Sequence, residues 1–219
     1  VAAVSASGTS GFSNEASVTP GNAYGAPVPI PVPNNSFELD QQTGYIVPQD
    51  WAFTTNISTP SGDAANSNPA VQYVNSITNN PVAGVDGTYY WDPSDYGEQS
   101  APYGSETSIL TTASSLGTFT ANTQYTLTVA LGTPNDNALS SKSIGFQLLA
   151  NGLVVANFVA PTSGAGALVQ GTGLSDFSLT YSTVGQPQLV GQNITVALVY
   201  TYTGQYGRDA YFDNVRLTQ

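Results

Sequence analysis

The sequence predicts an all-β protein folded as a two-sheet antiparallel sandwich of the jelly-roll type, with a β-hairpin arm at its N-terminus. Apolar residues alternate with small or polar ones along residues 125–131 and 144–148, which is the period of a half-buried strand. The 22 glycines and 14 prolines divide the chain into short stretches of this kind. No stretch follows the helical period, so two sheets packed face to face satisfy the pattern best.

The C-terminal half gives the clearest individual elements. Residues 177–181 and 194–202 alternate in the same way, and the second of these is the longest predicted strand. An Asn-Gly pair at residues 151–152 lies between two apolar runs, which is a strong signal for a two-residue hairpin. Tyr200 and Tyr202 share one face of the longest strand with aliphatic residues, so we expect both to pack in the core. Trp51 stands at a predicted strand start and is also expected there.

The N-terminal third divides into an arm, a linker and the start of the main domain. Residues 1–20 read as two strands around a glycine-rich turn at residues 8–11, and the Ser-Asn-Glu at residues 13–15 resembles the last hairpin of a fibronectin type III domain. A generic hairpin arm is the alternative. Residues 21–33 carry alternating prolines, which remove backbone donors and favour an extended linker. We therefore expect the main β-sandwich to span residues 34–219.

Composition excludes several classes of function. Three Lys and Arg stand against 14 Asp and Glu, for a net charge of −11, which argues against nucleic acid and anionic membranes as partners. No stretch has the ~20 apolar residues that a membrane-spanning helix needs. Without His or Cys, nucleophilic catalysis by Ser-His or Cys-His pairs is excluded. A two-carboxylate glycosidase has enough acids, but no pair stands out, so we expect no enzyme.

Two motifs at the ends of the main domain each place one carboxylate in a strand-like stretch. Glu38 closes the motif at residues 34–38, and Asp213 lies in the motif at residues 212–217. Burying an ionised carboxylate without a partner is very costly. No basic residue lies near Glu38, and Arg216 is the only one in the strand of Asp213. A metal ion shared by the first and last strands would resolve this cost.

Five motifs in a fixed order resemble the galactose-binding-like jelly-roll group, which contains many bacterial carbohydrate-binding modules. They are residues 34–38, 47–51, 86–87, 116–129 and 212–217, and the resemblance covers roughly residues 28–219. It implies a structural Ca²⁺ held by Glu38, Asp213 and backbone carbonyls near Asn35, in keeping with the oxygen ligands that calcium prefers. Asn35 stands where the group often has glycine. Two alternatives to the calcium site are open: both carboxylates accept hydrogen bonds from loop amides, or Glu38 forms an ion pair with Arg216.

Residues 86–106 concentrate five acids and five aromatics in a segment whose glycines and prolines indicate a loop. Sugar recognition needs this combination, because aromatic faces pack on sugar rings and carboxylates accept from hydroxyls. The alternative is that these side chains cover the sandwich edge and are solvated. A second aromatic set lies near the turn at residues 204–209, where Arg208 could instead pair with a neighbouring acid. The candidate ligand-binding residues are Trp91, Asp92, Tyr96, Glu98, Tyr103, Tyr206 and Arg208.

These observations together predict a non-catalytic module that binds a polysaccharide or another glycan. Abundant Ser, Thr, Asn, Gly and Tyr with few Lys is typical of secreted or cell-surface bacterial proteins. The alternative function is a structural subunit of an extracellular filament or surface layer. In that case residues 1–20 would mediate self-association by adding a strand to the sheet edge of another copy.

Overall fold

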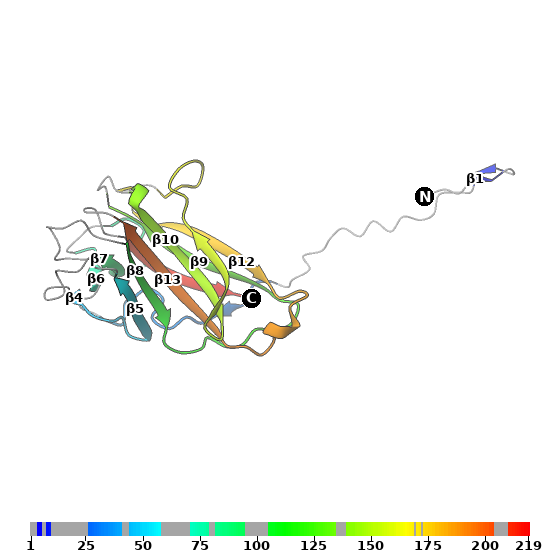
Figure 1. Ribbon diagram of the computed structural model, residues 1–219, viewed down its shortest axis with the longest axis horizontal. Coiled ribbons are helices and arrows are strands. Elements are labelled where there is room, and N and C mark those ends of the chain that lie inside the picture. The colour runs from blue at the N-terminus through cyan, green and yellow to red at the C-terminus, as the bar shows by residue number, and fades with distance from the viewer. Residues whose placement is uncertain are drawn as a thin grey trace.

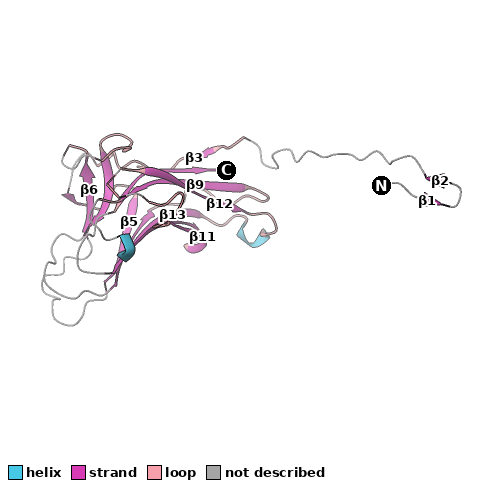
Figure 2. Ribbon diagram, turned by 90° about the horizontal axis from the view of Figure 1, so that it is seen from above, coloured by secondary structure: helices cyan, strands magenta, loops and turns pink. Residues whose placement is uncertain are grey.

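The structure of this chain is a computed structural model, which describes residues 4–5, 8–9, 26–40, 44–57, 71–78, 82–94, 105–134, 139–168, 170–171, 173–203 and 210–219. Two antiparallel sheets stack face to face (Figure 1, Figure 2). The predicted all-β sandwich of jelly-roll type is therefore confirmed. Two short 3₁₀ segments, η1 (Leu139–Ser141) and η2 (Pro187–Leu189), are the helical elements of the described residues.

Five strands form one sheet and seven form the other. The five-stranded sheet has the order β11 (Leu153–Val159), β10 (Lys142–Ala150), β13 (Ile194–Thr203), β8 (Ser105–Thr112) and β5 (Trp51–Ile57). The seven-stranded sheet has the order β12 (Ser175–Ser182), β9 (Gln124–Gly132), β14 (Tyr211–Thr218), β7 (Tyr89–Ser94), β6 (Val71–Ser76) and β4 (Gly44–Tyr45), and β3 (Pro29–Ile30) also pairs with β14.

The strands predicted from alternation are present. Residues 125–131, 144–148, 177–181 and 194–202 fall within β9, β10, β12 and β13, and β13, with 10 residues, is the longest strand among the described residues. The predicted hairpin joins β10 to β11. Asn151 and Gly152 both adopt left-handed φ angles of 47° and 80°, as the two central residues of a type I′ turn must.

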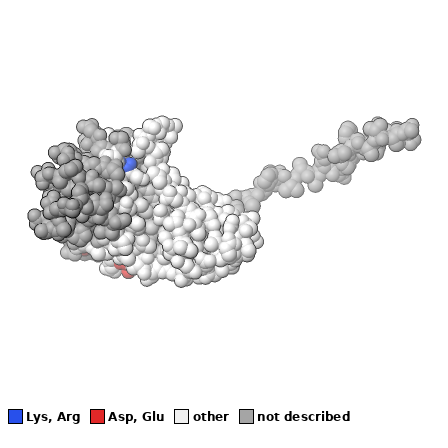
Figure 3. All heavy atoms as spheres, viewed as in Figure 1, with Lys and Arg blue, Asp and Glu red and all other residues white. Residues whose placement is uncertain are grey.

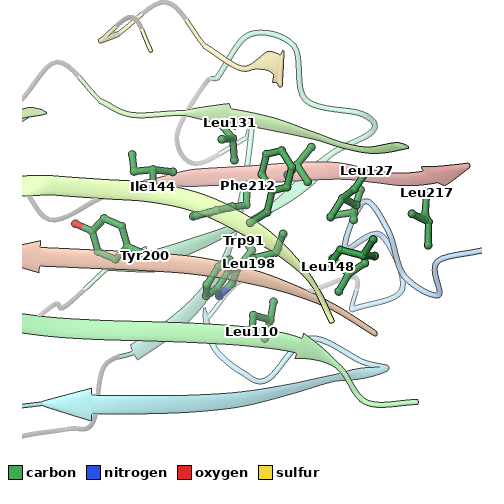
Figure 4. Close-up of a cluster of buried hydrophobic side chains, with 14 of the residues drawn as sticks. Trp91, Leu110, Leu127, Leu131, Ile144, Leu148, Leu198, Tyr200, Phe212 and Leu217 are labelled. Carbon is green, nitrogen blue, oxygen red and sulfur yellow. The ribbon is translucent and has the colours of Figure 1, made fainter. Parts of the chain in front are cut away.

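One hydrophobic core fills the space between the sheets (Figure 4). Leu110, Leu148 and Leu198 point into it from the five-stranded sheet, and Leu127 and Phe212 from the other. Each fully buried side chain of this kind contributes about 1.5–3 kcal/mol to stability. Trp51, Tyr200 and Tyr202 are also buried in this core, as predicted.

Strand β14 ties the two ends of the domain together. Leu217 and Thr218 pair with Ile30 and Pro29, so the sheet begins within the segment that we interpreted as a linker. The register of β14 against β9 shifts between Asp213 and Arg216, and Asn214 has a left-handed φ of 48° there. This bulge matters for the site described below, because it holds the Asp213 side chain.

Two sequence-based interpretations need correction or fall partly outside the described residues. Within residues 86–106, which we predicted to be mostly loop, Tyr89–Ser94 forms β7 in the seven-stranded sheet, and residues 95–104 lie outside the described part. In the N-terminal arm, β1 (Val4–Ser5) pairs with β2 (Gly8–Thr9), but residues 10–25 lie outside the described part, so the fibronectin-like hairpin stays a prediction. No helix within the described residues is long and apolar enough to cross a membrane.

Candidate functional site

Two polar regions stand out in this apolar sandwich, and the first is an acidic cluster in which Asp213 is buried, Glu38 is partly buried and Asp86 is exposed. Asp213 is fully buried. Its Oδ2 accepts a hydrogen bond from the backbone N–H of Asp86 at 2.6 Å, and its Oδ1 accepts one from the N–H of Asn214 at 2.7 Å. Glu38 Oε1 accepts two, from the N–H groups of Thr88 and Tyr89, both at 2.7 Å. Hydrogen bonds to loop amides, one of the predicted alternatives, are therefore present.

The backbone around these carboxylates is tightly constrained. In the turn that carries Glu38, Asn34 and Phe37 adopt left-handed φ angles of 45° and 60°, although a bulky residue such as Phe37 rarely does so. The Asn35 carbonyl accepts a hydrogen bond from the N–H of Val215 at 2.9 Å. Gly87 packs directly on Glu38, since a Cβ there would lie 2.5 Å from its carboxyl carbon. This strained turn brings the Asn35 carbonyl and Glu38 to the bulge of β14.

The electrostatics of the cluster are unbalanced. Burial raises the pKa of Asp213 from 3.8 to about 8, against the backbone hydrogen bonds from Asp86 and Asn214, which lower it. The negative charges of Asp86 and Glu38 raise the pKa further. Arg216 pairs with Asp176 at 2.5 Å, so the predicted alternative of a Glu38–Arg216 pair is wrong. The described residues contain no group of three or more His, Cys, Asp or Glu side chains placed to hold a metal, so backbone oxygens would have to complete a calcium shell.

The second region, which we call the polar end, lies between the sheets where the strands finish. In the five-stranded sheet Leu198 lies opposite Leu110 and Phe146. Further along β13 the side chains become more polar, because Tyr200 lies opposite Ser108 and Tyr202 lies opposite Lys142. The polar end comprises Ser108, Thr133, Lys142, Tyr200 and Tyr202, all of them buried.

One hydrogen bond crosses between the sheets at the polar end. The Lys142 ammonium donates to Thr133 Oγ1 at 2.9 Å, although the side chain is only 6% exposed. Thr133 follows β9 and lies two residues beyond Leu131, so its side chain shares the inward face. A charged donor is thus held between two walls of aromatic and aliphatic side chains.

Charged side chains are also scarce on the described part of the surface that Figure 3 draws. This face shows few of them.

Trp91 lies one row below the polar end in the seven-stranded sheet. The register places it opposite Phe212, which in turn lies opposite Leu131. Trp91 is 0% exposed, and its ring centroid lies 4.8 Å from that of Phe212. Its indole Nε1 is buried and has no hydrogen-bond partner among the described residues. Figure 4 shows the Trp91 side chain between the two layers of strands.

The residues predicted to bind ligand fall into two groups. Trp91 and Asp92 are described, and both are buried in β7 with their side chains on opposite faces of the sheet. Tyr96, Glu98, Tyr103, Tyr206 and Arg208 lie outside the described residues. The sequence reasoning passed over Lys142 and Thr133, although alternation along 142–148 already places Lys142 on the face of Ile144 and Phe146.

Comparison with known proteins identifies the family. Residues 28–218 match the sequence profile of the HpiC1-like family, described as HpiC1 cyclase, so the chain belongs to this family. Comparison with curated protein sequences finds no match. The interpretation as a carbohydrate-binding module that is not an enzyme is therefore wrong. So are the polysaccharide partner and the alternative of a structural subunit that self-associates through residues 1–20.

Solved structures of cyclases share the fold of this chain. A cyclase from Fischerella sp. TAU has a TM-score of 0.63 at 20% identity, covering 88% of this chain and 97% of its own. The Stig cyclase Fisc from the same organism, in complex with (3Z)-3-(1-methyl-2-pyrrolidinylidene)-3H-indole, scores 0.62 at 19% identity, with coverages of 88% and 98%. A Fischerella sp. TAU cyclase in complex with 4-(1H-indol-3-yl)butan-2-one scores 0.62 at 18% identity, also covering 88% and 98%.

Proposed function

We propose that this protein is a cyclase that closes a ring on a small molecule bearing an indole. Membership of the HpiC1-like family supports the reaction class. The substrate class is supported by the indole compounds in the related cyclase structures, which share this fold at 18–19% identity. Ring closure of this kind rearranges bonds within one molecule, so the product has the same mass as the substrate.

The polar end is the proposed place of reaction. The observation that carries this proposal is the change from aliphatic side chains in the middle of the core to Lys142, Thr133 and Tyr202 at its end. Small-molecule sites are mostly apolar, with a few polar groups that fix the orientation of the ligand. The tyrosine rings offer flat apolar surfaces to an indole, and the buried setting strengthens every polar contact to it.

Lys142 is the proposed polarising group. Its ammonium would donate to an oxygen or nitrogen acceptor in the side chain of the substrate and draw electrons toward it. The indole carbon that attacks would then meet a more electrophilic centre, and Thr133 Oγ1, which already accepts from Lys142, would keep the ammonium in position. Preorganised donors of this kind act strongly because little reorganisation is needed during the reaction.

The test is a search for isomerisation. The purified protein is incubated with indoles whose side chains carry a carbonyl, an imine or an alkene, and the products are separated by liquid chromatography with mass detection. We expect a new compound of unchanged mass, absent when the protein is heat-denatured first. A chain that converts none of these compounds and binds none of them would overturn the proposal.

We also propose that Glu38, Asp213 and the carbonyl of Asn35 hold a structural Ca²⁺. The fit rests on the donor set, since two carboxylates and a carbonyl are hard oxygen ligands. It also rests on position and charge, since each carboxylate is fixed by two backbone N–H hydrogen bonds, and a cation would offset the negative charges of Asp86 and Glu38 beside the buried Asp213. When bound, the ion would neutralise both carboxylates and tie the turn of Glu38 to β14. Calcium binding followed by calorimetry tests this, with Glu38→Gln as the variant expected to bind none.

A further inference from the structure

We infer that the indole N–H of Trp91 is a specificity-determining donor, which binds a neutral acceptor atom of the substrate. This inference rests on the proposed function, because it assigns one residue of the site at the polar end. The acceptor would be a carbonyl oxygen or an imine nitrogen carried by a flat aromatic molecule. Trp91 thereby becomes a substrate-binding residue, one row below Lys142.

The first argument is the state of the donor itself. Nε1 is buried and has no hydrogen-bond partner among the described residues, and Trp91 is fully buried. A buried donor without a partner loses its hydration and gains nothing in return, so each such group in a native structure calls for an explanation. The surroundings of Trp91 in the core, including Leu110, Leu198 and Phe212, would accept a phenylalanine without that loss.

The second argument comes from the other tryptophan of the chain. Trp51 is also buried and also packs on a phenylalanine, with its ring centroid 5.8 Å from that of Phe37. Its Nε1 donates to the backbone carbonyl of Asn34 at 3.2 Å. The fold therefore gives the Trp51 indole N–H an acceptor. It gives the Trp91 indole N–H, beside the polar end, no acceptor among the described residues.

The third argument is position. Trp91 lies opposite Phe212, which lies opposite Leu131, and Thr133 stands two residues further on the same inward face. A molecule held by Lys142 and Thr133 therefore lies directly above the Trp91 row. The Lys142 ammonium and the Trp91 indole N–H, in successive rows, would then bind two acceptor atoms of the substrate. These would be either two separate acceptors or one acceptor and an atom conjugated with it.

The experiment is a binding cycle with two ligands and two proteins. The ligands are 4-(1H-indol-3-yl)butan-2-one and 3-butylindole, which differ only in the carbonyl group. The proteins are the parent chain and Trp91→Phe, and affinities come from titration calorimetry. We expect the parent to prefer the ketone by roughly tenfold, the size of one hydrogen bond to a buried donor. Trp91→Phe should bind both ligands equally, whatever effect the smaller ring has on the size of the site.

Trp51→Phe is the matched control. It should keep the preference for the ketone but melt at a lower temperature, because it leaves the Asn34 carbonyl without its donor. Trp91→Phe should melt no lower than Trp51→Phe.

Each outcome decides between the claims. A Trp91→Phe protein that prefers the ketone as strongly as the parent would overturn the inference and leave the cyclase proposal intact. A parent that binds the ketone no better than 3-butylindole would do the same. A parent that binds neither ligand and isomerises no indole would overturn the proposed function, and the inference with it.

Discussion

The acidic cluster and the polar end are both polar regions of an apolar sandwich, yet they are built in different ways. In the acidic cluster, each carboxylate is held by two backbone N–H groups, and the surrounding turn is strained into left-handed conformations. In the polar end, side chains on regular strands point between the sheets, and the hydrogen bond from Lys142 to Thr133 joins one side chain to another. The first arrangement fixes backbone, whereas the second presents groups that a small molecule can use. Of the two regions, only the polar end therefore resembles a reaction site.

The largest expected effect is the pH dependence of the metal-free chain. Because the pKa of Asp213 is raised to about 8 in the folded state from 3.8, the unfolded chain loses this proton first as the pH rises. The contribution of Asp213 to stability should therefore be fully present below about pH 4 and be lost as the pH rises through 8, by an amount on the order of 5 kcal/mol. Urea unfolding in the presence of a chelator measures it. Asp213→Asn should lack the decline, and an unchanged slope in that variant would assign the effect to other groups.

Calcium gives the next largest effect. At a concentration about 100-fold above its Kd, a bound ion stabilises the fold by about 2.7 kcal/mol, which raises the melting temperature by roughly 5–10 °C. Glu38→Gln is a sharp control because Oε1 can keep both amide hydrogen bonds while the charge is removed. Differential scanning calorimetry should show a calcium response in the parent and none in this variant. Equal responses would mean that Glu38 does not bind the ion.

Two glycines separate steric crowding at the acidic cluster from ordinary backbone strain. Gly87 and Gly152 have similar φ angles of 96° and 80°, but only at Gly87 would a Cβ meet the Glu38 carboxyl group. Gly152→Ala should cost about 1 kcal/mol of unfolding free energy from backbone strain alone. Gly87→Ala should cost about 1–3 kcal/mol more, in the range for overpacking, and should weaken calcium binding. Similar costs in chemical denaturation would contradict this placement of Glu38.

The smallest expected effect on stability, but the clearest on activity, comes from comparing substitutions at Lys142 and Arg216. Lys142→Met should lower the rate of isomerisation at least tenfold, or about 1.4 kcal/mol of transition-state stabilisation. Arg216→Met removes a charge from the exposed pair with Asp176. It should leave the rate unchanged and alter stability by no more than about 1 kcal/mol. A Lys142→Met protein with parental activity would remove the polar end from the reaction.

The fold was predictable because its signals are local. Alternation marked β9, β10, β12 and β13, and the Asn-Gly pair marked the turn between β10 and β11. The glycines and prolines of residues 86–106 predicted a loop, but Pro93 lies within strand β7. Within the described residues, β7 pairs with β14 at Trp91 and Phe212 alone, so no described ladder bond to β14 is lost at Pro93, which explains why a proline is tolerated there.

The function was not predictable by the same reasoning. The motifs around Glu38 and Asp213 describe how the first and last strands are joined, and one fold can host many unrelated functions. These motifs therefore do not distinguish a cyclase from a binding module. Lys142 carries no motif, and it gains meaning only when the two sheets are stacked and Thr133 comes within 2.9 Å of it. That Trp91 Nε1 has no hydrogen-bond partner in the described part of the chain likewise depends on packing and cannot be read from the sequence.

A titration followed by NMR shows whether an indole ligand binds at the polar end or at the acidic cluster. In a ¹⁵N–¹H correlation spectrum, 4-(1H-indol-3-yl)butan-2-one is titrated into the calcium-loaded protein. We predict the largest shifts for the indole N–H of Trp91 and for the backbone amides of Thr133, Lys142 and Tyr202. Shifts centred on Glu38, Thr88 and Asn214, or no saturable shifts, would contradict it.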